Sequence, residues 1–356
     1  MTELLSAQDE ATALEQLHES GCTDGLPVII PTPERVDRMV LASGLDADMV
    51  LGAMGPGNGL ATIEKVAVAA VMAGCLPDYM PLVVASVKAV IDPVFDLTEM
   101  QATTHCTAPL IIVNGPARHL CGPVASGYGA LGPGHRANAS IGRALRLAMI
   151  NIGKGRPGVS DMALLGHPGK FTYCLAEDEE NSPLAPLHVD LGFDAEDSVV
   201  TVVGAEAPHS VIFSGSGDDP RIYGILLDML AIGLANPATN NAILTSGTGV
   251  VVLNPDHAAV LAKAGLKRQD IAAELCERCV MSPEQQKRLM PTMVGPDPQP
   301  RPAFTDPSQI LILMAGGNGL YSMVMPSWST GTHKNSPSSM KVELSFACEV
   351  PGLAAS

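Results

Sequence analysis

Four short runs of Ile, Val and Leu constrain the fold of this chain most strongly. They span residues 110–113, 199–203, 250–253 and 310–313. Each run has the length and composition of a strand buried on both faces, and each ends abruptly in turn residues. Runs with helical periodicity lie between them. The sequence therefore predicts an α/β fold, in which the loops at the strand ends are the natural place for a ligand site.

A Gly-rich turn ahead of an apolar helical run occurs three times, at intervals of 77 and 83 residues. The turns span residues 55–58, 132–135 and 215–218, and the helical runs span 62–73, 140–152 and 220–234. Near-even spacing is typical of a repeated unit. Free backbone N–H groups and the helix dipole at such turns favour an anion. We expect internal pseudo-repeats of Gly-rich loop, helix and buried strand, whose three turns surround one ligand. The alternative for any single turn is an ordinary connection.

The distribution of Gly, Pro and acidic residues divides the chain into three parts. Residues 1–153 form an N-terminal α/β part with two Gly-rich-loop helices, and residues 199–356 form a C-terminal α/β part. Between them, residues 154–198 have few periodic signals and are expected to form a long loop or junction. Further helices are predicted at 3–19, 33–43 and 81–91, and the polar segment 330–339 is predicted to be surface loop.

Composition limits the classes of partner. The chain has 356 residues, of which 46% are hydrophobic, so it can fill real cores. A formal net charge of −16 argues against nucleic acids and anionic membranes, because both are polyanions. The first 13 residues lack the features of a secretory signal, and the longest uncharged apolar run, 66–77, is too short to span a bilayer. We expect a cytoplasmic homo-oligomer whose eight cysteines are reduced thiols.

Several segments together resemble a poorly characterised bacterial family. They are DGLPV at 24–28, PTPERV at 31–36, VMAGCLP at 71–77, QATTH at 101–105, GALGPG at 129–134, RANA at 136–139, IGRA at 141–144, LGHPGK at 165–170, and Cys174 with Ala176 and Glu177. The resemblance covers roughly residues 16–260. It implies an association with a small UGSC-type partner protein, which carries a Cys- or selenocysteine-Gly-Ser-Cys motif, and it implies no particular reaction. Relatives tend to have Trp where this chain has Cys22, and their C-terminal end does not resemble segment 328–339.

The second Gly-rich turn carries the strongest set of binding residues. Gly134 and His135 precede Arg136, and backbone donors there, together with the guanidinium, suit a carboxylate or phosphate held in a forked geometry. Asn138 is either a further binding residue or a helix cap. Arg143 lies on a similar side of the helix or is a surface charge. The predicted substrate-binding set is completed by Gly57, Asn58, Ser216 and Asn318.

Glu177 is the predicted proton-transfer residue. It is the first charge after the apolar run 171–176, and a carboxylate whose pKa is raised by burial can abstract or deliver protons near neutral pH. Lys170 is expected to pair with Glu177 or to polarise a substrate carbonyl. His105 or His135 is expected to assist. The next acidic residues, Asp178 and Glu179, are interpreted as solvated surface charges.

Three groups of cysteines are candidates for thiol or metal chemistry. Cys22 lies in a turn beside Asp24 and between glycines, where it is either a nucleophile or redox centre or a half-buried structural residue. His105 and Cys106, taken with His119 and Cys121, match no common zinc module, so we favour His105 as a general acid or base over a metal site. The pair Cys276 and Cys279 stands alone in a helical pattern and is interpreted as structural.

These features predict a small-molecule enzyme rather than a nucleotide-dependent one. The sequence has no P-loop, no Gly-x-Ser-x-Gly motif and no complete Rossmann fingerprint, so it supports no nucleotide cofactor, and no metal is expected. We expect a lyase, hydratase or hydrolase that acts on a small anionic metabolite by acid–base chemistry, with or without help from a thiol. Two alternatives stay open: a thiol–disulfide redox protein using Cys22, and a binding module without turnover.

Overall fold

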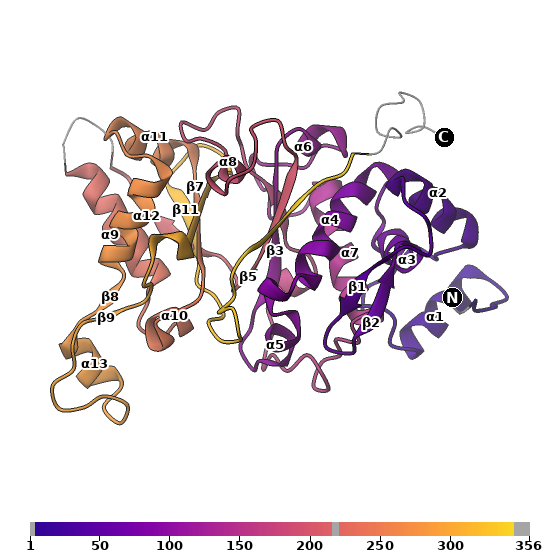
Figure 1. Cartoon of the computed structure of the whole chain (residues 1–356), viewed down its shortest axis with the longest axis horizontal. Helices are drawn as coiled ribbons and strands as arrows, with labels where there is room; N and C mark the ends of the chain where they lie inside the picture. The colour runs from indigo at the N-terminus through magenta and orange to yellow at the C-terminus, as the bar shows by residue number, and fades with distance from the viewer. Residues whose placement is uncertain (1–3, 216–220, 345–356) are drawn as a thin grey trace.

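The computed structural model describes residues 4–215 and 221–344 and has the predicted α/β architecture. Four layers stack in the order helices, sheet, sheet, helices (Figure 1). Buried apolar side chains form three clusters, one between the two sheets and one between each sheet and its helices. Each sheet is thus covered on both faces, which explains why its strands read as continuous apolar runs rather than as alternating ones.

The first half of the chain supplies the helices on one outer side and most of the first sheet (Figure 1). Its elements are α1 (Glu10–Glu19), α2 (Pro33–Ser43), β1 (Val50–Met54), β2 (Gly59–Thr62), α3 (Ile63–Ala73), η1 (Pro77–Tyr79), α4 (Met80–Ile91), η2 (Pro93–Phe95), α5 (Leu97–Ala102), β3 (Ala108–Asn114), α6 (Ala117–Leu120), α7 (Arg136–Asn151), η3 (Pro168–Lys170), β4 (Cys174–Ala176), α8 (Leu187–Asp190) and β5 (Val199–Ala205).

The second half supplies the other outer helices and all four strands of the second sheet. Its elements are β6 (His209–Ile212), α9 (Ile222–Leu234), α10 (Asn240–Leu244), β7 (Gly249–Leu253), α11 (Pro255–Lys263), α12 (Arg268–Arg278), β8 (Val280–Met281), α13 (Pro283–Leu289), β9 (Arg301–Pro302), η4 (Pro307–Gln309), β10 (Ile310–Met314), β11 (Tyr321–Met325) and β12 (Ser338–Lys341). Within the described ranges, no helix is long and apolar enough to cross a membrane.

Local capping signals set several helix boundaries. The Thr32 side chain accepts a hydrogen bond from the backbone N–H of Arg35, and α2 begins at Pro33 and ends before a left-handed Gly44, which confirms the predicted 33–43 helix. By contrast, α1 begins at Glu10 and not at residue 3. The Asp9 side chain accepts from the N–H of Thr12 and starts the helix there, so the prediction for 3–19 was too long.

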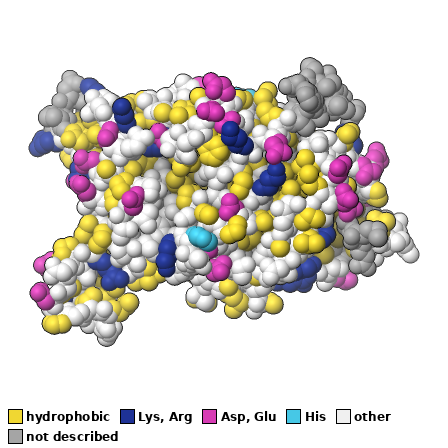
Figure 2. All heavy atoms as spheres, in the orientation of Figure 1, with side chains coloured by type: hydrophobic (Ala, Val, Ile, Leu, Met, Phe, Trp, Pro, Cys, Tyr) yellow, Lys and Arg dark blue, Asp and Glu magenta, His cyan; other side chains and the backbone are white. Residues whose placement is uncertain are grey.

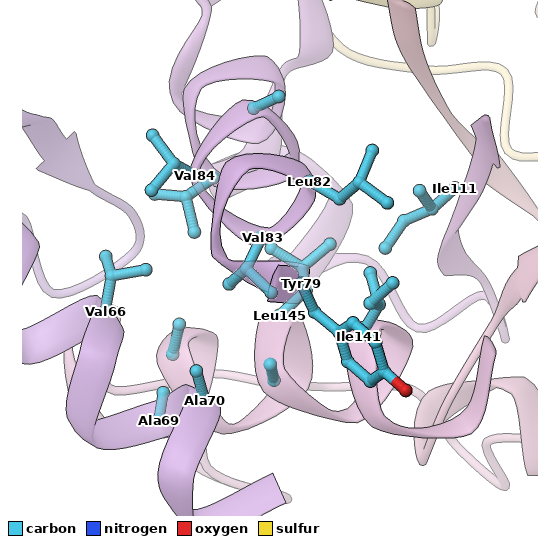
Figure 3. Packing of buried hydrophobic residues seen from close by; sticks show 14 of the residues in the cluster. Val66, Ala69, Ala70, Tyr79, Leu82, Val83, Val84, Ile111, Ile141 and Leu145 are labelled. Atoms are coloured by element: carbon cyan, nitrogen blue, oxygen red, sulfur yellow. The ribbon is translucent and has the colours of Figure 1, made fainter. Parts of the chain in front are cut away.

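Strand β3 shows how one apolar run serves two cores. Leu110 and Ile112 face the second sheet, whereas Ile111 and Val113 face the helices, and all four are fully buried. Figure 3 shows Ile111 facing Leu82 of α4 and residues of α7. Because successive strand residues point to opposite faces, every residue of such a central strand must be apolar.

The two sheets share one strand plan. In the first, β4 and β3 are parallel, β5 is antiparallel to β3, and β12 is antiparallel to β5. In the second, β10 and β7 are parallel, β11 is antiparallel to β7, and β6 is antiparallel to β11. The first sheet is completed by β12 from the second half of the chain, whereas all four strands of the second sheet come from the second half. The common plan is therefore twofold, and it does not follow the three Gly-rich turns.

The first two Gly-rich turns cannot surround one ligand. The N–H of Gly57 donates to the carbonyl of Gly153, just after α7, whereas Gly134 lies just before α7. A helix of 16 residues is about 24 Å long, so the two turns lie at opposite ends of it. The first turn also joins β1 to β2 and does not open a helix. Ser216 and most of the third turn lie outside the described residues.

Two further predictions need correction. The first sheet takes strands from all three predicted parts, namely β3 from 1–153, β4 from 154–198, and β5 and β12 from 199–356, so the sheets do not divide at residues 153 and 198. Segment 330–339 is not simply surface loop, because Asn335 is fully buried. Its side chain accepts from the N–H of Gly204 and donates to the carbonyl of Gly204, both at 3.0 Å.

Candidate active site at the amino end of the first sheet

The ends of the strands in the first sheet form two separate clusters of polar residues. Since β3 and β4 are parallel and β5 is antiparallel to them, the starts of β3 and β4 lie with the end of β5. We call this side the amino end of the sheet. The ends of β3 and β4 lie with the start of β5 on the opposite side, which we call the carboxyl end.

Glu177 lies at the carboxyl end and is completely enclosed. Its exposed fraction is 0%, and its carboxylate accepts hydrogen bonds from Asn114 Nδ2 at 2.6 Å and from the N–H of Leu187 at 2.7 Å. The other oxygen is 2.7 Å from Nη2 of Arg268. Burial raises the pKa of Glu177, while the positive charge of Arg268 acts in the opposite direction. The catalytic role predicted for Glu177 stays a prediction, and its carboxylate has no exposed face.

Arg268 links the layers at the carboxyl end. From α12 it donates to the carbonyls of Ile312 and Ala185, and it pairs with Asp190 at 2.5 Å as well as with Glu177. Its guanidinium is thus used in four directions. A buried arginine with this set of partners holds elements of the two sheets in register rather than waiting for a substrate.

The acidic run after Glu177 is not a solvated surface. Glu179 accepts from the N–H of Gly115 at 2.8 Å and pairs with Arg118 at 3.0 Å, and its side chain is only 11% exposed. Asp178 is also buried. Glu180 pairs with the same Arg118, and this hydrogen bond lowers the pKa of Glu180 to about 2. The interpretation of Asp178 and Glu179 as solvated charges was therefore wrong.

The amino end carries a histidine–carboxylate pair. His105 precedes β3 and Glu206 follows β5, and the antiparallel pairing of these strands brings His105 Nε2 within 2.8 Å of Glu206 Oε1. Both side chains are partly exposed, 20% and 29% respectively. His105 Nδ1 is buried and has no hydrogen-bond partner among the described residues. A carboxylate that holds one ring nitrogen fixes the ring and leaves the other nitrogen free to exchange a proton.

Lys170 lies at the amino end and not beside Glu177. Its Nζ donates to Asp161 Oδ1 at 2.7 Å, and Asp161 Oδ2 is 3.5 Å from Nη1 of Arg146. The expected pairing with Glu177 was wrong, because β4 runs between the two residues. Burial, followed by the nearby charge of Arg146, lowers the pKa of Lys170. Burial also lowers the pKa of Arg146, whose Nη2 has no partner in the described part of the chain.

A thiol belongs to the same group of residues. Cys106 is half-buried, and its Sγ accepts the backbone N–H of Gly166 at 3.2 Å. Cys106 and Lys170 lie close enough to interact electrostatically. A backbone donor and a nearby cation are typical of the surroundings of a reactive thiol.

His167 lies on the same side of the sheet, and its imidazole ring contacts Ala205 and Tyr173. Its Nε2 is 3.2 Å from the carbonyl of Ala205, and its ring meets Tyr173 edge-on at 5.8 Å. Burial is the main cause that lowers the pKa of His167. This histidine is therefore neutral near pH 7, and it can accept a proton only under more acidic conditions than a free histidine.

Gln101 adds a buried amide close to His105 in the sequence. It lies on α5, is 1% exposed, and neither polar atom of its side chain has a hydrogen-bond partner among the residues described. Gly155 makes room for it, since a Cβ at that position would lie 2.4 Å from Nε2 of Gln101. Buried amides are nearly always satisfied, so an unsatisfied one indicates a place for water or for a ligand group.

The residues predicted around the second Gly-rich turn bind the protein's own backbone. Arg136 is exposed and donates to the carbonyl of Gly74 at 3.1 Å. Asn138 is buried and exchanges hydrogen bonds with both backbone groups of Ala125. Gly134 is exposed next to His135, whose Nε2 is 3.0 Å from the carbonyl of Tyr128. The structure does not bring this turn to the amino-end cluster.

The remaining predicted residues are dispersed. Arg143 is not a free surface charge, because it pairs with Asp24 at 2.7 Å. Cys22 is half-buried, and its carbonyl accepts from Asn151. Asn318 donates to Asp256 at 2.7 Å. Asn58, next to Gly57, lines a separate cavity that is described below.

The predicted histidine–cysteine set is split between the two ends. His119 pairs with Glu180 at the carboxyl end, and Cys121 is fully buried. His105 and Cys106 lie at the amino end. Across residues 4–215 and 221–344, no group of three or more His, Cys, Asp or Glu side chains is placed to hold a metal ion.

The sequence analysis singled out Lys170, and His105 together with Cys106, but it did not group them with Gln101, Asp161, His167 or Glu206. A signal was available for part of this set, because the segments 101–105 and 165–170 both carry the family resemblance and both lie at the amino end. No family model, curated protein or solved structure matches the chain.

Proposed function

We propose that the amino end of the first sheet is the active site of an enzyme that performs acid–base chemistry on a small anionic metabolite. The observation that carries this proposal is the His105–Glu206 pair with a free, buried Nδ1 on His105. In such a pair the carboxylate orients the imidazole and stabilises its protonated form, and the free nitrogen takes or gives the proton. A lyase or hydratase needs this transfer at a carbon next to a carboxylate.

The positive groups of the site support an anionic substrate. Lys170 and Arg146 both contact the carboxylate of Asp161 in a partly desolvated place, while the second carboxylate of the site, Glu206, is held by His105. The two cations can stabilise the negative charge that develops when a proton leaves a carbon next to a carboxylate. The buried amide of Gln101 supplies one further donor and one further acceptor.

Cys106 favours a second candidate function, that of a thiol-dependent hydrolase. The Gly166 N–H on its Sγ and the nearby Lys170 both stabilise a thiolate. In this case Cys106 attacks an acyl carbon, the leaving group departs with a proton from His105, and water releases the acid. The redox alternative at Cys22 has less support, since Asp24 lies two residues away and a nearby cation, Arg156, donates to the carbonyl of Ser20.

Proton exchange tests the proposal without knowledge of the substrate. Small hydroxy acids, keto acids and dicarboxylates are incubated with the protein in D2O, and NMR follows loss of C–H signals or addition of water. We expect exchange with at least one compound, and we expect Glu206→Gln to slow it strongly while Glu180→Gln, on the opposite side of the sheet, leaves it unchanged. Equal rates in all three proteins would contradict the assignment. The hydrolase candidate is tested in the same way, by measuring hydrolysis of a panel of thioesters and activated esters.

The cellular context is part of the proposal. We infer a cytoplasmic homo-oligomer with a UGSC-type partner protein, as the resemblance implies. Leu164 and Leu165 are 78% and 94% exposed just before His167, and they give a second copy or a partner an apolar surface. Light scattering of the parent and of Leu165→Ser tests whether this surface is used.

A further inference from the structure

A second site lies away from the amino end, in a cavity of about 280 Å³. Four separate segments line it: the β1–β2 hairpin at 53–58, the end of α4 with residues 90–93, the start of α5 at 96–99, and the C-terminal segment at 332–333. This volume is close to the lower end of the range for small-molecule sites. The cavity therefore suits a small metabolite.

The described lining of this cavity is acidic, whereas the proposed active site also holds two cations, Lys170 and Arg146. Asp92, Asp96 and Glu99 line it, while Lys and Arg are absent from its described lining. His333 lies beside Asp96 and is the one group there that can carry a positive charge. Three carboxylates in a partly enclosed space repel an anion and attract a cation. The anionic substrate proposed for the amino end is thus excluded here.

Two of the three carboxylates have oxygen atoms free for a ligand. Asp96 is committed, because it accepts from the backbone N–H of His333 at 2.6 Å and lies 2.9 Å from its Nδ1. Asp92 uses one oxygen to accept the N–H of Val94. Glu99 is exposed and makes no side-chain hydrogen bond within the described part of the chain. Asp92 and Glu99 therefore offer three unused oxygens.

The walls of the cavity are held by contacts that do not involve the free groups. A Cβ on Gly55 would lie 2.1 Å from Thr98 Oγ1, so only glycine lets the hairpin approach α5 this closely. His333 is fixed by Asp96, and Asn335 two residues later is anchored to Gly204. The cavity is therefore preorganised, which lowers the cost of binding.

We propose that this cavity binds a small organic cation through a primary ammonium group, with Glu99 and Asp92 as the charged partners. The side-chain oxygens of Asn58 and Thr98, which line the same space, complete its hydrogen bonds. An ammonium has three donors and no fixed coordination geometry, so it suits oxygens spread over a cavity. A metal ion suits it less, because the residues described hold no three-ligand His, Cys, Asp or Glu cluster.

Calorimetric titration with 1,4-diaminobutane tests the proposal, with 1,4-butanediol as the neutral compound of the same length and MgCl2 as the metal. We expect the diamine to bind and the diol not to bind. Glu99→Gln and Asp92→Asn should each lower the affinity for the diamine by about tenfold to a hundredfold, since each removes a charge-assisted hydrogen bond. Glu15→Gln removes one exposed charge on α1 and should change nothing.

Asn58→Gly gives an independent check, because Asn58 has a left-handed backbone, φ 52°, that glycine adopts without strain. We expect several-fold weaker binding and an unchanged melting temperature. Absence of diamine binding at millimolar concentration, equal binding of the diol, tighter binding of Mg²⁺, or unaltered binding in both carboxylate variants would overturn the proposal. The readout is binding at this cavity, so it does not depend on activity at the amino end.

Discussion

The two ends of the first sheet use buried charge in different ways. At the carboxyl end, Glu177, Glu179 and Arg268 all have ionic partners, and those contacts link loops of both sheets. At the amino end, Arg146 Nη2, His105 Nδ1 and the Gln101 amide are buried with no partner among the described residues. Burial and charge alone do not distinguish a functional site from a structural one. Charged groups with unused hydrogen-bonding capacity are the better guide.

Both ends contain some unsatisfied polar atoms, so the comparison depends on which groups they belong to. Asn114 Oδ1 and His188 Nδ1 at the carboxyl end also lack hydrogen-bond partners within the described ranges, although His188 Nδ1 lies 4.0 Å from Glu179. The charged groups around them, however, all have ionic partners. Glu177 also has no exposed surface through which a substrate could reach it. Figure 2 shows one face of the molecule, on which acidic and basic side chains are interspersed with apolar ones and surface charge does not mark either end.

The largest expected effect is a difference in turnover between variants at the two ends of the sheet. His105→Gln should lower turnover by about a hundredfold to ten-thousandfold, the usual contribution of a general base, with little change in the free energy of unfolding. Glu177→Gln should instead change stability and leave the turnover of the folded enzyme close to that of the parent. Steady-state kinetics and urea titration measure both. The reverse pattern, with turnover lost only at Glu177, would transfer the active site to the carboxyl end.

The next effect concerns stability at the carboxyl end. Arg268→Met leaves the buried carboxylate of Glu177 without its charge partner, and it should lower the free energy of unfolding by about 3–5 kcal/mol. Adding Glu177→Gln to that variant should recover part of the loss, because the uncompensated charge is then gone. Lys170→Met at the amino end is the matched comparison and should cost less, since Arg146 still faces Asp161. Equal losses of unfolding free energy in Arg268→Met and Lys170→Met would contradict the proposed difference between the two ends.

Thiol reactivity gives a smaller effect that needs no substrate. Cys106 should be alkylated by iodoacetamide about tenfold or more faster than Cys279, because burial raises the pKa of Cys279 to about 12. Lys170→Met should slow the labelling of Cys106 by removing the nearby cation. Mass spectrometry of timed samples at pH 7.5 assigns each rate. Labelling of Cys22 ahead of Cys106 would favour the redox alternative instead.

The smallest effect is a pH dependence. The folded-state pKa of His167 lies below the usual histidine value of about 6.5, so the unfolded chain binds the proton more readily. Stability should therefore fall as the pH drops below about 6.5, and His167→Gln should flatten this part of the curve. Glu180 gives the contrast at the other end, since its pKa of about 2 makes its contribution present above about 4.5 and lost only as the pH falls towards 2. Thermal melts from pH 8 to about pH 2 measure both regions.

Local patterns predicted the fold elements well, whereas the site depended on distant pairing. The boundaries of α2 and the positions of β3 and β7 follow from capping residues and apolar runs within a few positions. The pair of His105 with Glu206 spans 101 residues, and that of Glu177 with Arg268 spans 91. No periodicity in the sequence encodes such contacts, because they arise only when the strand order and direction are fixed.

Lys170 shows why closeness in sequence misled the prediction. Glu177 is seven residues away and was expected to pair with it, yet β4 carries the chain across the sheet between them. Asp161, nine residues earlier, folds back to Lys170 through a segment with little periodicity. A strand separates its two flanking residues, whereas a loop can bring its ends together, so the loop partner was the better choice.

The late position of β12 in the chain bears on how the first sheet is made. When a ribosome has finished residues 1–215, the edge of β5 is still unpaired, because its neighbour β12 spans 338–341 near the other end of the chain. The first sheet thus stays incomplete until residues 338–341 have been made. Pairing across so long a separation is intrinsically slow, and an open strand edge invites pairing with other chains. Until β12 has been made, the edge of β5 in a nascent chain is therefore open to such pairing.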